Sequence, residues 1–209
     1  LTSFQFEVLN EAIERQDTIL ISGSTRSGKT TLANAFLTAI ARSPTVRICV
    51  VEDTRELQCS AANVIALRTN SSVTLRDLTR HALRLRPDRI VVGEVRGPEA
   101  VDLLNAWNTG HRGGISTIHA NGVASVFLRL QTLVAQDAGY ALPPALFAQA
   151  INLLVHIEMT GEVRRVSEIA RVVPVGDYFQ LETISAYCRI VPSDFRIVPA
   201  GESFQLGKC

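Results

Sequence analysis

The sequence predicts an α/β domain with a mostly parallel sheet flanked by helices, followed by an antiparallel β extension. Short, continuously apolar segments alternate with segments whose apolar residues recur at helical spacing. Strands without polar alternation are typical of parallel sheets that are buried on both faces. Beyond residue 155 strand-like segments follow one another without helices. We therefore place an α/β core at residues 1–155 and a β-rich extension of the same domain at 156–209.

The elements can be assigned in chain order. Leu9 and Ile13 have helical spacing in the first predicted helix, residues 1–16. Further helices are expected at 29–41, 74–85, 98–107, 123–137 and 144–153, and strands of the core at 18–22, 46–51, 89–92 and 115–118. Pro87 ends the third helix and Pro98 begins the fourth. The extension is expected to contain strands at 155–159, 166–175, 178–184 and 188–198.

Composition excludes several classes of protein. The 209 residues are 46% hydrophobic and 20% charged with a mean hydropathy of +0.17, which excludes a disordered or fibrous chain. No apolar run approaches the ~18 residues that span a bilayer. Four scattered cysteines favour a reducing, cytoplasmic setting. A net charge of +1 argues against strong direct nucleic-acid binding. The first residue is Leu1 instead of methionine, so we expect further protein upstream.

Residues 23–30, GSTRSGKT, fit the phosphate-binding pattern G-x-x-x-x-G-K-[S/T] between a strand and a helix. Glycines let successive backbone N–H groups point at phosphate oxygens, and the helix N-terminus adds a positive dipole. Lys29 is expected to reach the β- and γ-phosphates and the Thr30 hydroxyl to bind Mg²⁺. A nucleoside triphosphate is therefore the predicted ligand. The predicted nucleotide-binding residues are Gly23, Ser24, Thr25, Arg26, Ser27, Gly28, Lys29, Thr30 and Thr31.

Acidic residues follow two of the predicted strands. The strand at 46–51 is followed by Glu52, Asp53 and, shortly after, Glu56, and the strand at 89–92 by Glu94. Ligands of open α/β sheets bind at the carboxyl ends of strands, so these acids are candidates for metal binding and for orienting water. The alternative is that they cap helices or lie in solvent, and for Glu56 the two readings are equally supported.

One histidine and one arginine complete the predicted site. His119 ends the strand at 115–118 and is a candidate contact to the γ-phosphate, although a lone histidine is more often structural. Arg96 follows Glu94 by two residues. Guanidinium groups stabilise charge on a transferred phosphoryl group, and we expect Arg96 to act from a neighbouring subunit.

Four ordered segments resemble the secretion or traffic ATPase superfamily, in its type IV secretion and conjugative-transfer branch. They are GSTRSGKT, the Asp box VEDTRELQC, the Walker B segment LRLRPDRIVVGEVRG and the His-box segment WNTGHRGGISTIHAN. The resemblance covers residues 2–184 and implies a RecA-like ATPase domain. The nearest pattern is the ATPase of plasmid conjugation. One departure is that the usual loop G-G-T-G-S-G-K-T has Ser24 and Arg26 in place of two glycines. Those positions can still form the cradle if their φ angles are negative.

The resemblance implies roles and partners. It makes Glu52, Asp53 and Glu56 the Asp-box acids, Glu94 the Walker B glutamate that acts through metal-bound or attacking water, and His119 a γ-phosphate contact. The cofactors would be ATP and Mg²⁺, with Thr30 and Glu94 as metal-binding residues. Family members form hexameric rings in the cytoplasm, peripheral on the inner membrane, with secretion-system components as partners. Their N-terminal domain is absent from this chain.

Three functions are consistent with these residues. The first is a Mg²⁺-dependent ATP-hydrolysing motor for type IV secretion, conjugative DNA transfer or pilus assembly. The second is a RecA-like helicase or translocase, which the near-zero net charge disfavours. The third is a weakly hydrolysing nucleotide-binding scaffold, suggested by Arg26 and the absent upstream domain. A GTPase is disfavoured because the chain lacks an N-K-x-D motif.

Overall fold

The computed structural model describes residues 1–136 and 141–186. Helices occupy most of the segments in which the sequence has helical periodicity, and two of them begin with a threonine capping box, at Thr2 and Thr74. The helices are α1 (Ser3–Glu14), α2 (Lys29–Ile40), α3 (Leu75–Ala82), η1 (Leu83–Leu85), α4 (Glu99–Asn108), η2 (Val123–Ser125), α5 (Val126–Val134) and α6 (Pro144–Ala150). Pro98 immediately precedes α4, as expected for a first helical turn.

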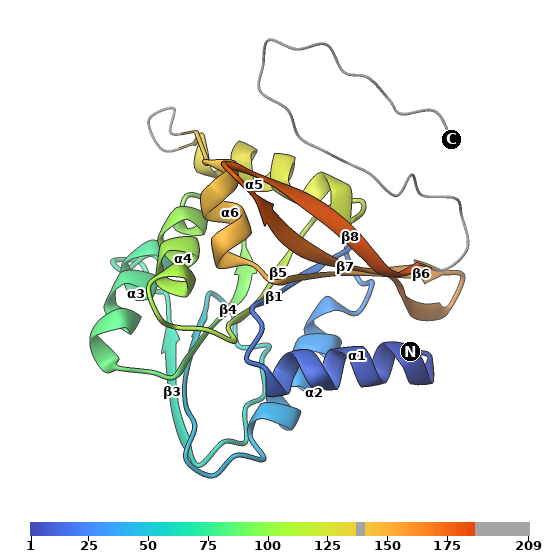
Figure 1. Ribbon diagram of the computed structural model, residues 1–209. Coiled ribbons are helices and arrows are strands. Elements are labelled where there is room, and N and C mark those ends of the chain that lie inside the picture. Colours follow the sequence, from blue (N-terminus) through green and yellow to red (C-terminus); the bar gives the residue numbers. More distant parts are fainter. Residues whose placement is uncertain (137–140, 187–209) are drawn as a thin grey trace.

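The strands form one mixed sheet (Figure 1). They are β1 (Ile19–Ser22), β2 (Arg47–Glu52), β3 (Asn63–Arg68), β4 (Arg89–Val95), β5 (Ile115–Ile118), β6 (Leu153–Thr160), β7 (Val163–Val175) and β8 (Tyr178–Ala186). Their order is β3-β2-β4-β5-β1-β6-β7-β8. The strands from β3 to β6 pair in parallel, whereas β6, β7 and β8 pair antiparallel. The predicted architecture, a parallel core with an antiparallel extension, is therefore confirmed.

Alternate residues of the central strands enter two cores on opposite faces of the sheet. In β1, Ile19 and Ile21 pack with α1 and α2, while Leu20 packs on the other face with α3–α6. Figure 1 shows this arrangement, with α1 and α2 below the sheet and α4, α5 and α6 above it. Both faces are covered by helices, which explains why these strands have no polar alternation.

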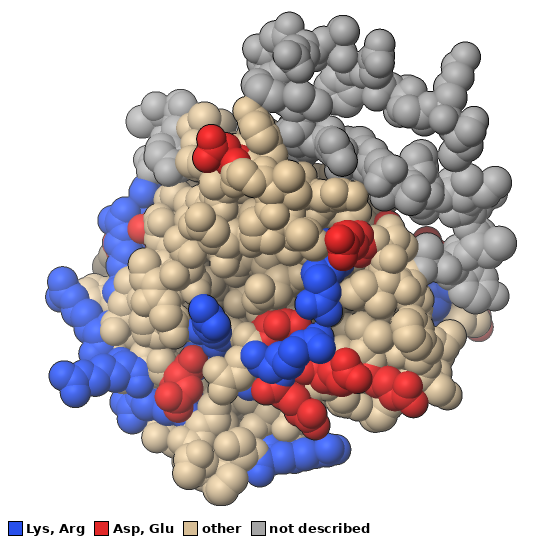
Figure 2. All heavy atoms as spheres, in the orientation of Figure 1, with Lys and Arg blue, Asp and Glu red and all other residues tan. Residues whose placement is uncertain are grey.

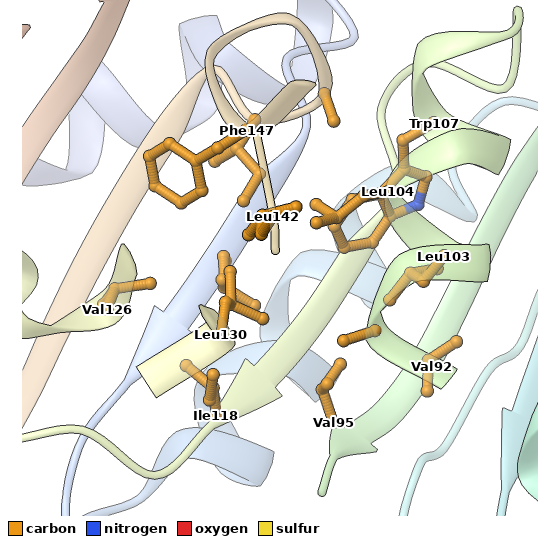
Figure 3. Close-up of a cluster of buried hydrophobic side chains, with 14 of the residues drawn as sticks. Val92, Val95, Leu103, Leu104, Trp107, Ile118, Val126, Leu130, Leu142 and Phe147 are labelled. Atoms are coloured by element: carbon orange, nitrogen blue, oxygen red, sulfur yellow. The ribbon is translucent and has the colours of Figure 1, made fainter. Parts of the chain in front are cut away.

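The larger core lies between the sheet and helices α4–α6 (Figure 3). Leu104 and Trp107 of α4, Leu130 of α5 and Phe147 of α6 belong there to one buried cluster with Ile118 of β5. Rings of Phe127, Phe147 and Phe179 pack edge-on or tilted, with centroids 4.6–5.2 Å apart. These contacts join the extension to the helical layer of the core.

Several element boundaries differ from the expected ones. Strand β3 is missing from the sequence-based assignment, because it is an edge strand whose side chains alternate between exposed and half-buried. The helix expected at 144–153 ends at Ala150, since Leu153 already begins β6. That strand spans residue 155, so the core and the extension share it. The strand expected at 188–198 lies outside the described residues.

Charged side chains of both signs lie beside one another on the face shown in Figure 2, where no uninterrupted basic stripe is visible. Basic groups gather mainly at the left edge of that view, on the side where Figure 1 places α3. Within the described residues, no helix has both the length and the apolar character needed to cross a bilayer.

Candidate functional site

The phosphate-binding pattern forms a loop between β1 and α2, as expected. Gly28 directly precedes α2 with φ +104°, a left-handed conformation that favours glycine. Gly23 lies against β6, where a Cβ atom would collide with the Ile157 carbonyl oxygen and lie 2.6 Å from the Ser27 hydroxyl. The loop therefore needs glycine at both ends for physical reasons.

Arg26 adopts a left-handed conformation with φ +64°. The cradle expected from the sequence requires negative φ angles at Ser24 and Arg26. This holds at Ser24, whose φ is not positive, and fails at Arg26. The left-handed region costs a residue with a Cβ roughly 1–2 kcal/mol. The loop therefore keeps the conformation of a glycine position in spite of the arginine.

Lys29 points back along its own loop. Its ammonium donates to the carbonyl oxygens of Gly23 and Ser24 at 3.0 and 2.9 Å and lies 3.3 Å from Nδ1 of His119. The residue is 7% exposed, and burial lowers the Lys29 pKa from its ordinary value. The lysine ammonium thus lies in a desolvated position and donates to two carbonyl oxygens. The oxygens of a bound phosphate could accept these hydrogen bonds in their place.

Glu94 is aimed into the same region by an irregularity in β4. The register between β4 and β5 shifts between Val92 and Val95, and the Thr117 hydroxyl donates to the Gly93 carbonyl at 2.9 Å. One carboxylate oxygen of Glu94 lies 2.7 Å from Nε2 of His119, and the other accepts from Nε and Nη2 of Arg96 at 2.8 and 2.5 Å. These hydrogen bonds to Glu94 raise the pKa of Arg96.

The contacts of His119 fix its tautomer. The Lys29 ammonium can only donate, so Nδ1 of His119 accepts from it. The remaining ring proton is then on Nε2, which lies 2.7 Å from one carboxylate oxygen of Glu94. His119 thereby links the lysine of the loop to the glutamate of β4.

The three Asp-box acids have different environments. Glu52 is buried, and one of its oxygens accepts from the backbone N–H groups of Glu56 and Leu57 at 3.0 and 2.7 Å. Glu56 is exposed and accepts from the Thr30 hydroxyl at 3.2 Å. Asp53 is exposed at the cavity wall. Glu52 thus holds the loop that presents Glu56 to Thr30.

These groups surround a cavity of about 320 Å³. Its lining residues are Thr25, Arg26, Lys29, Thr30, Glu52, Asp53, Thr54, Glu56, Leu57, Gly93, Glu94, Arg96, Thr117 and His119. Every residue predicted to be catalytic lies in this set. Ser27 is buried outside the set with its hydroxyl unpartnered among the described atoms, and Thr31 is exposed.

Several residues near the site were missed by the sequence-based prediction, among them Glu99, Ile157 and Arg164. The Glu99 carboxylate accepts from the backbone N–H groups of Arg96 and Gly97 at 2.7 and 2.8 Å and so holds the segment after Glu94. Ile157 of β6 and Arg164 of β7 lie against Gly28. The one local signal for Glu99 is its position in the first turn of α4, where an acid can bind free N–H groups.

The donors present fit a magnesium ion that is bound together with phosphates. Mg²⁺ takes one or two carboxylates and keeps several waters. The Thr30 hydroxyl and the Glu56 carboxylate already meet, and Glu94 lines the same cavity. No group of three or more potential ligands from His, Cys, Asp and Glu forms a self-contained metal site in residues 1–136 and 141–186.

The fold and the site together define a RecA-like P-loop domain. The family described as "Type II/IV secretion system protein" matches residues 2–169, and the chain belongs to this family. It is 44% identical over 173 residues to "Conjugal transfer protein TrbB" of Rhizobium radiobacter, covering 82% of this chain and 53% of that protein. It is 38% identical over 180 residues to "Type IV secretion system protein PtlH" of Bordetella pertussis, covering 78% and 52%. The chain thus spans about half the length of these relatives.

Solved structures show the same fold. The VirB11 ATPase of the Brucella suis type IV secretion system, crystallised with sulphate, matches with a TM-score of 0.73 and 32% identity over 82% of this chain and 56% of that one. The pilus retraction motor PilT matches with a TM-score of 0.62 at 23% identity, over 90% and 54%, which supports the fold alone. The predicted relationship to secretion ATPases is confirmed.

Proposed function

We propose that this chain carries the ATP-hydrolysing site of a motor that powers type IV secretion, conjugative DNA transfer or pilus assembly. The observation that carries the proposal is the convergence of Lys29, His119 and Glu94 in one cavity at the carboxyl edge of the sheet. The names of the relatives support the transfer role. VirB11, described with bound sulphate, supports an affinity for tetrahedral anions.

In the proposed reaction, water attacks the γ-phosphorus in line and the bond to the β-phosphate oxygen breaks, giving ADP and phosphate. Loop N–H groups and Lys29 hold the β- and γ-phosphates, for which Lys29 leaves the carbonyl oxygens of Gly23 and Ser24. Glu94 orients the water. Mg²⁺ bound near Thr30 would neutralise charge on the phosphates. His119 lies against Glu94 through its Nε2 and so keeps the carboxylate positioned.

ATP turnover by the full-length protein tests this proposal. Lys29→Ala and Glu94→Gln should each lower turnover at least about 100-fold, because each removes a group that stabilises the transition state. Arg42→Ala is the control, since Arg42 is an exposed arginine at the far end of α2. Equal turnover by all four proteins would refute the site. Strong stimulation by DNA at moderate salt would favour the helicase alternative.

We also propose a hexameric ring in the cytoplasm, peripheral on the inner membrane and docked on secretion-system components. The support is membership of the secretion family. The expected action of Arg96 from a neighbouring subunit adds no support, because Arg96 binds Glu94 of its own chain. Light scattering of the full-length protein with ATP should give the mass of six subunits. A persistent monomer would contradict the ring.

One observation favours weak hydrolysis as a second candidate. Arg96 binds Glu94 of its own chain through two nitrogens, and so occupies the oxygen that would otherwise bind water. Arg96→Ala separates the two roles. Turnover rises if Arg96 restrains Glu94, and falls if Arg96 stabilises the phosphoryl group.

A further inference from the structure

Arg164 of β7 belongs to the hairpin that β6 and β7 form, and it lies over the phosphate-binding loop. A Cβ atom built on Gly28 would be 3.0 Å from Cδ of Arg164 and 3.8 Å from its Nε, so the stem of the arginine crosses the glycine that begins α2. The residue is exposed. Within the described part of the chain, its guanidinium has no hydrogen bond or ion pair. Five N–H donors are therefore available next to the loop.

The register of the hairpin explains why this arginine faces the loop. Val155 pairs with Ile169, Ile157 with Val166 and Met159 with Arg164. The first two pairs lie in the core below the sheet with α1 and α2, so Arg164 continues the same row toward α2. This requires a bulge, because Val166 and Ile169 are three residues apart.

The bulge is at Ser167, the unpaired residue between the partners of His156 and Ile157. Without it, Arg165 would take the place of Arg164. In the structure Arg165 is on the opposite face, opposite Glu158, with Nε 4.0 Å from that carboxylate. The two neighbouring arginines thus have different environments.

Arg164 is also on the opposite side of the loop from the acids. Lys29 meets His119, which follows β5 and contacts Glu94 of β4, whereas Gly28 is covered by Ile157 and Arg164 from β6 and β7. The sheet order places β1, which leads into the loop, between these two groups of strands. A nucleotide whose γ-phosphate meets Glu94 therefore extends its other end toward the hairpin.

We propose that Arg164 is a nucleotide-binding residue that holds the nucleoside end of the ligand, the portion shared by ATP and ADP. This rests on the proposed function. The guanidinium can donate to an α-phosphate oxygen or a ribose hydroxyl while its stem remains packed on Gly28. Hydrolysis takes place at the other end, so Arg164 has no part in the chemical step.

The test is the affinity of the full-length protein for ADP and for a non-hydrolysable ATP analogue, measured by calorimetry. Arg164→Met keeps an unbranched stem over Gly28 and removes the guanidinium. It should weaken both ligands by the same factor, about 10-fold, as expected for loss of a charge-assisted hydrogen bond at a partly exposed site.

Arg165→Met is the matched control, because it removes the same charge from the other face of the hairpin. Wild-type affinity in Arg164→Met, equal weakening in both variants, or loss of the ATP analogue alone would each overturn the inference. Lys29→Ala distinguishes the two proposals. If it abolishes binding while Arg164→Met does not weaken it, the proposed nucleotide site stands and the role of Arg164 fails. If the wild type binds neither ligand, the proposed function itself fails.

Discussion

Glu52 offers a test of whether an acid of the Asp box acts by chemistry or by positioning. The residue is 5% exposed, and one carboxylate oxygen accepts from the N–H groups of both Glu56 and Leu57. Leu57 is itself buried in the core against α2. Glu52→Ala would remove the acceptor from both N–H groups and should cost about 2–4 kcal/mol in the free energy of unfolding.

Glu52→Gln retains a carbonyl oxygen in the same place. It loses only the charge-assisted part of two hydrogen bonds, so about 1 kcal/mol is expected. Urea unfolding followed by Trp107 fluorescence measures both variants, because Trp107 is the single tryptophan of the chain and is buried. ATP turnover should follow the same order, with Gln near the wild type and Ala impaired through the displaced Glu56.

Two results would refute this reasoning. If Gln and Ala were equally destabilising, the bonds to the backbone would not be the source of the effect. If Glu52→Gln were fully stable and yet inactive, the negative charge itself would take part in the reaction.

Three further perturbations test the loop, the buried titratable groups and the core. Arg26→Gly should stabilise the protein by up to about 1 kcal/mol, because glycine adopts the left-handed φ without strain. Arg26→Ala keeps the Cβ and should give no such gain. The melting temperatures of the two variants and the wild type test this difference. His156 contacts the Ser22 hydroxyl at 2.9 Å, and burial lowers the pKa of its ring from the ordinary value. The unfolded state therefore binds the proton more readily, and the free energy of unfolding should fall as the pH drops through about 6.5, the pKa of an unfolded histidine. His156→Gln should remove this part of the pH dependence, and an unchanged profile would contradict it. Phe147→Ala should cost about 3–5 kcal/mol in urea unfolding, since this ring is fully buried between Phe127 and Phe179; a loss below about 1 kcal/mol would contradict the packing.

The sequence predicts those parts of the site that depend on local order. The loop at residues 23–30 and the acids Glu52 and Glu94 each follow an apolar strand, and parallel strands bring their carboxyl ends to one edge. Arg164 could not be found this way. Its position depends on pairing between β6 and β1 and on the bulge at Ser167, both of which are long-range features. Strand β3 was missed because an exposed edge has little apolar signal.

The charges of the cavity bear on how a nucleotide can enter it. Four acids line it, Glu52, Asp53, Glu56 and Glu94, against three cations, Arg26, Lys29 and Arg96. Two of those cations are already engaged, Lys29 with loop carbonyls and Arg96 with Glu94. A triphosphate adds several negative charges to a wall that is acidic on balance, so its entry alone is opposed by repulsion. In the proposed reaction the ligand is therefore the nucleotide together with a divalent cation. The acids near Thr30 then favour binding, since they attract that cation while Lys29 moves from the loop carbonyls to the phosphates.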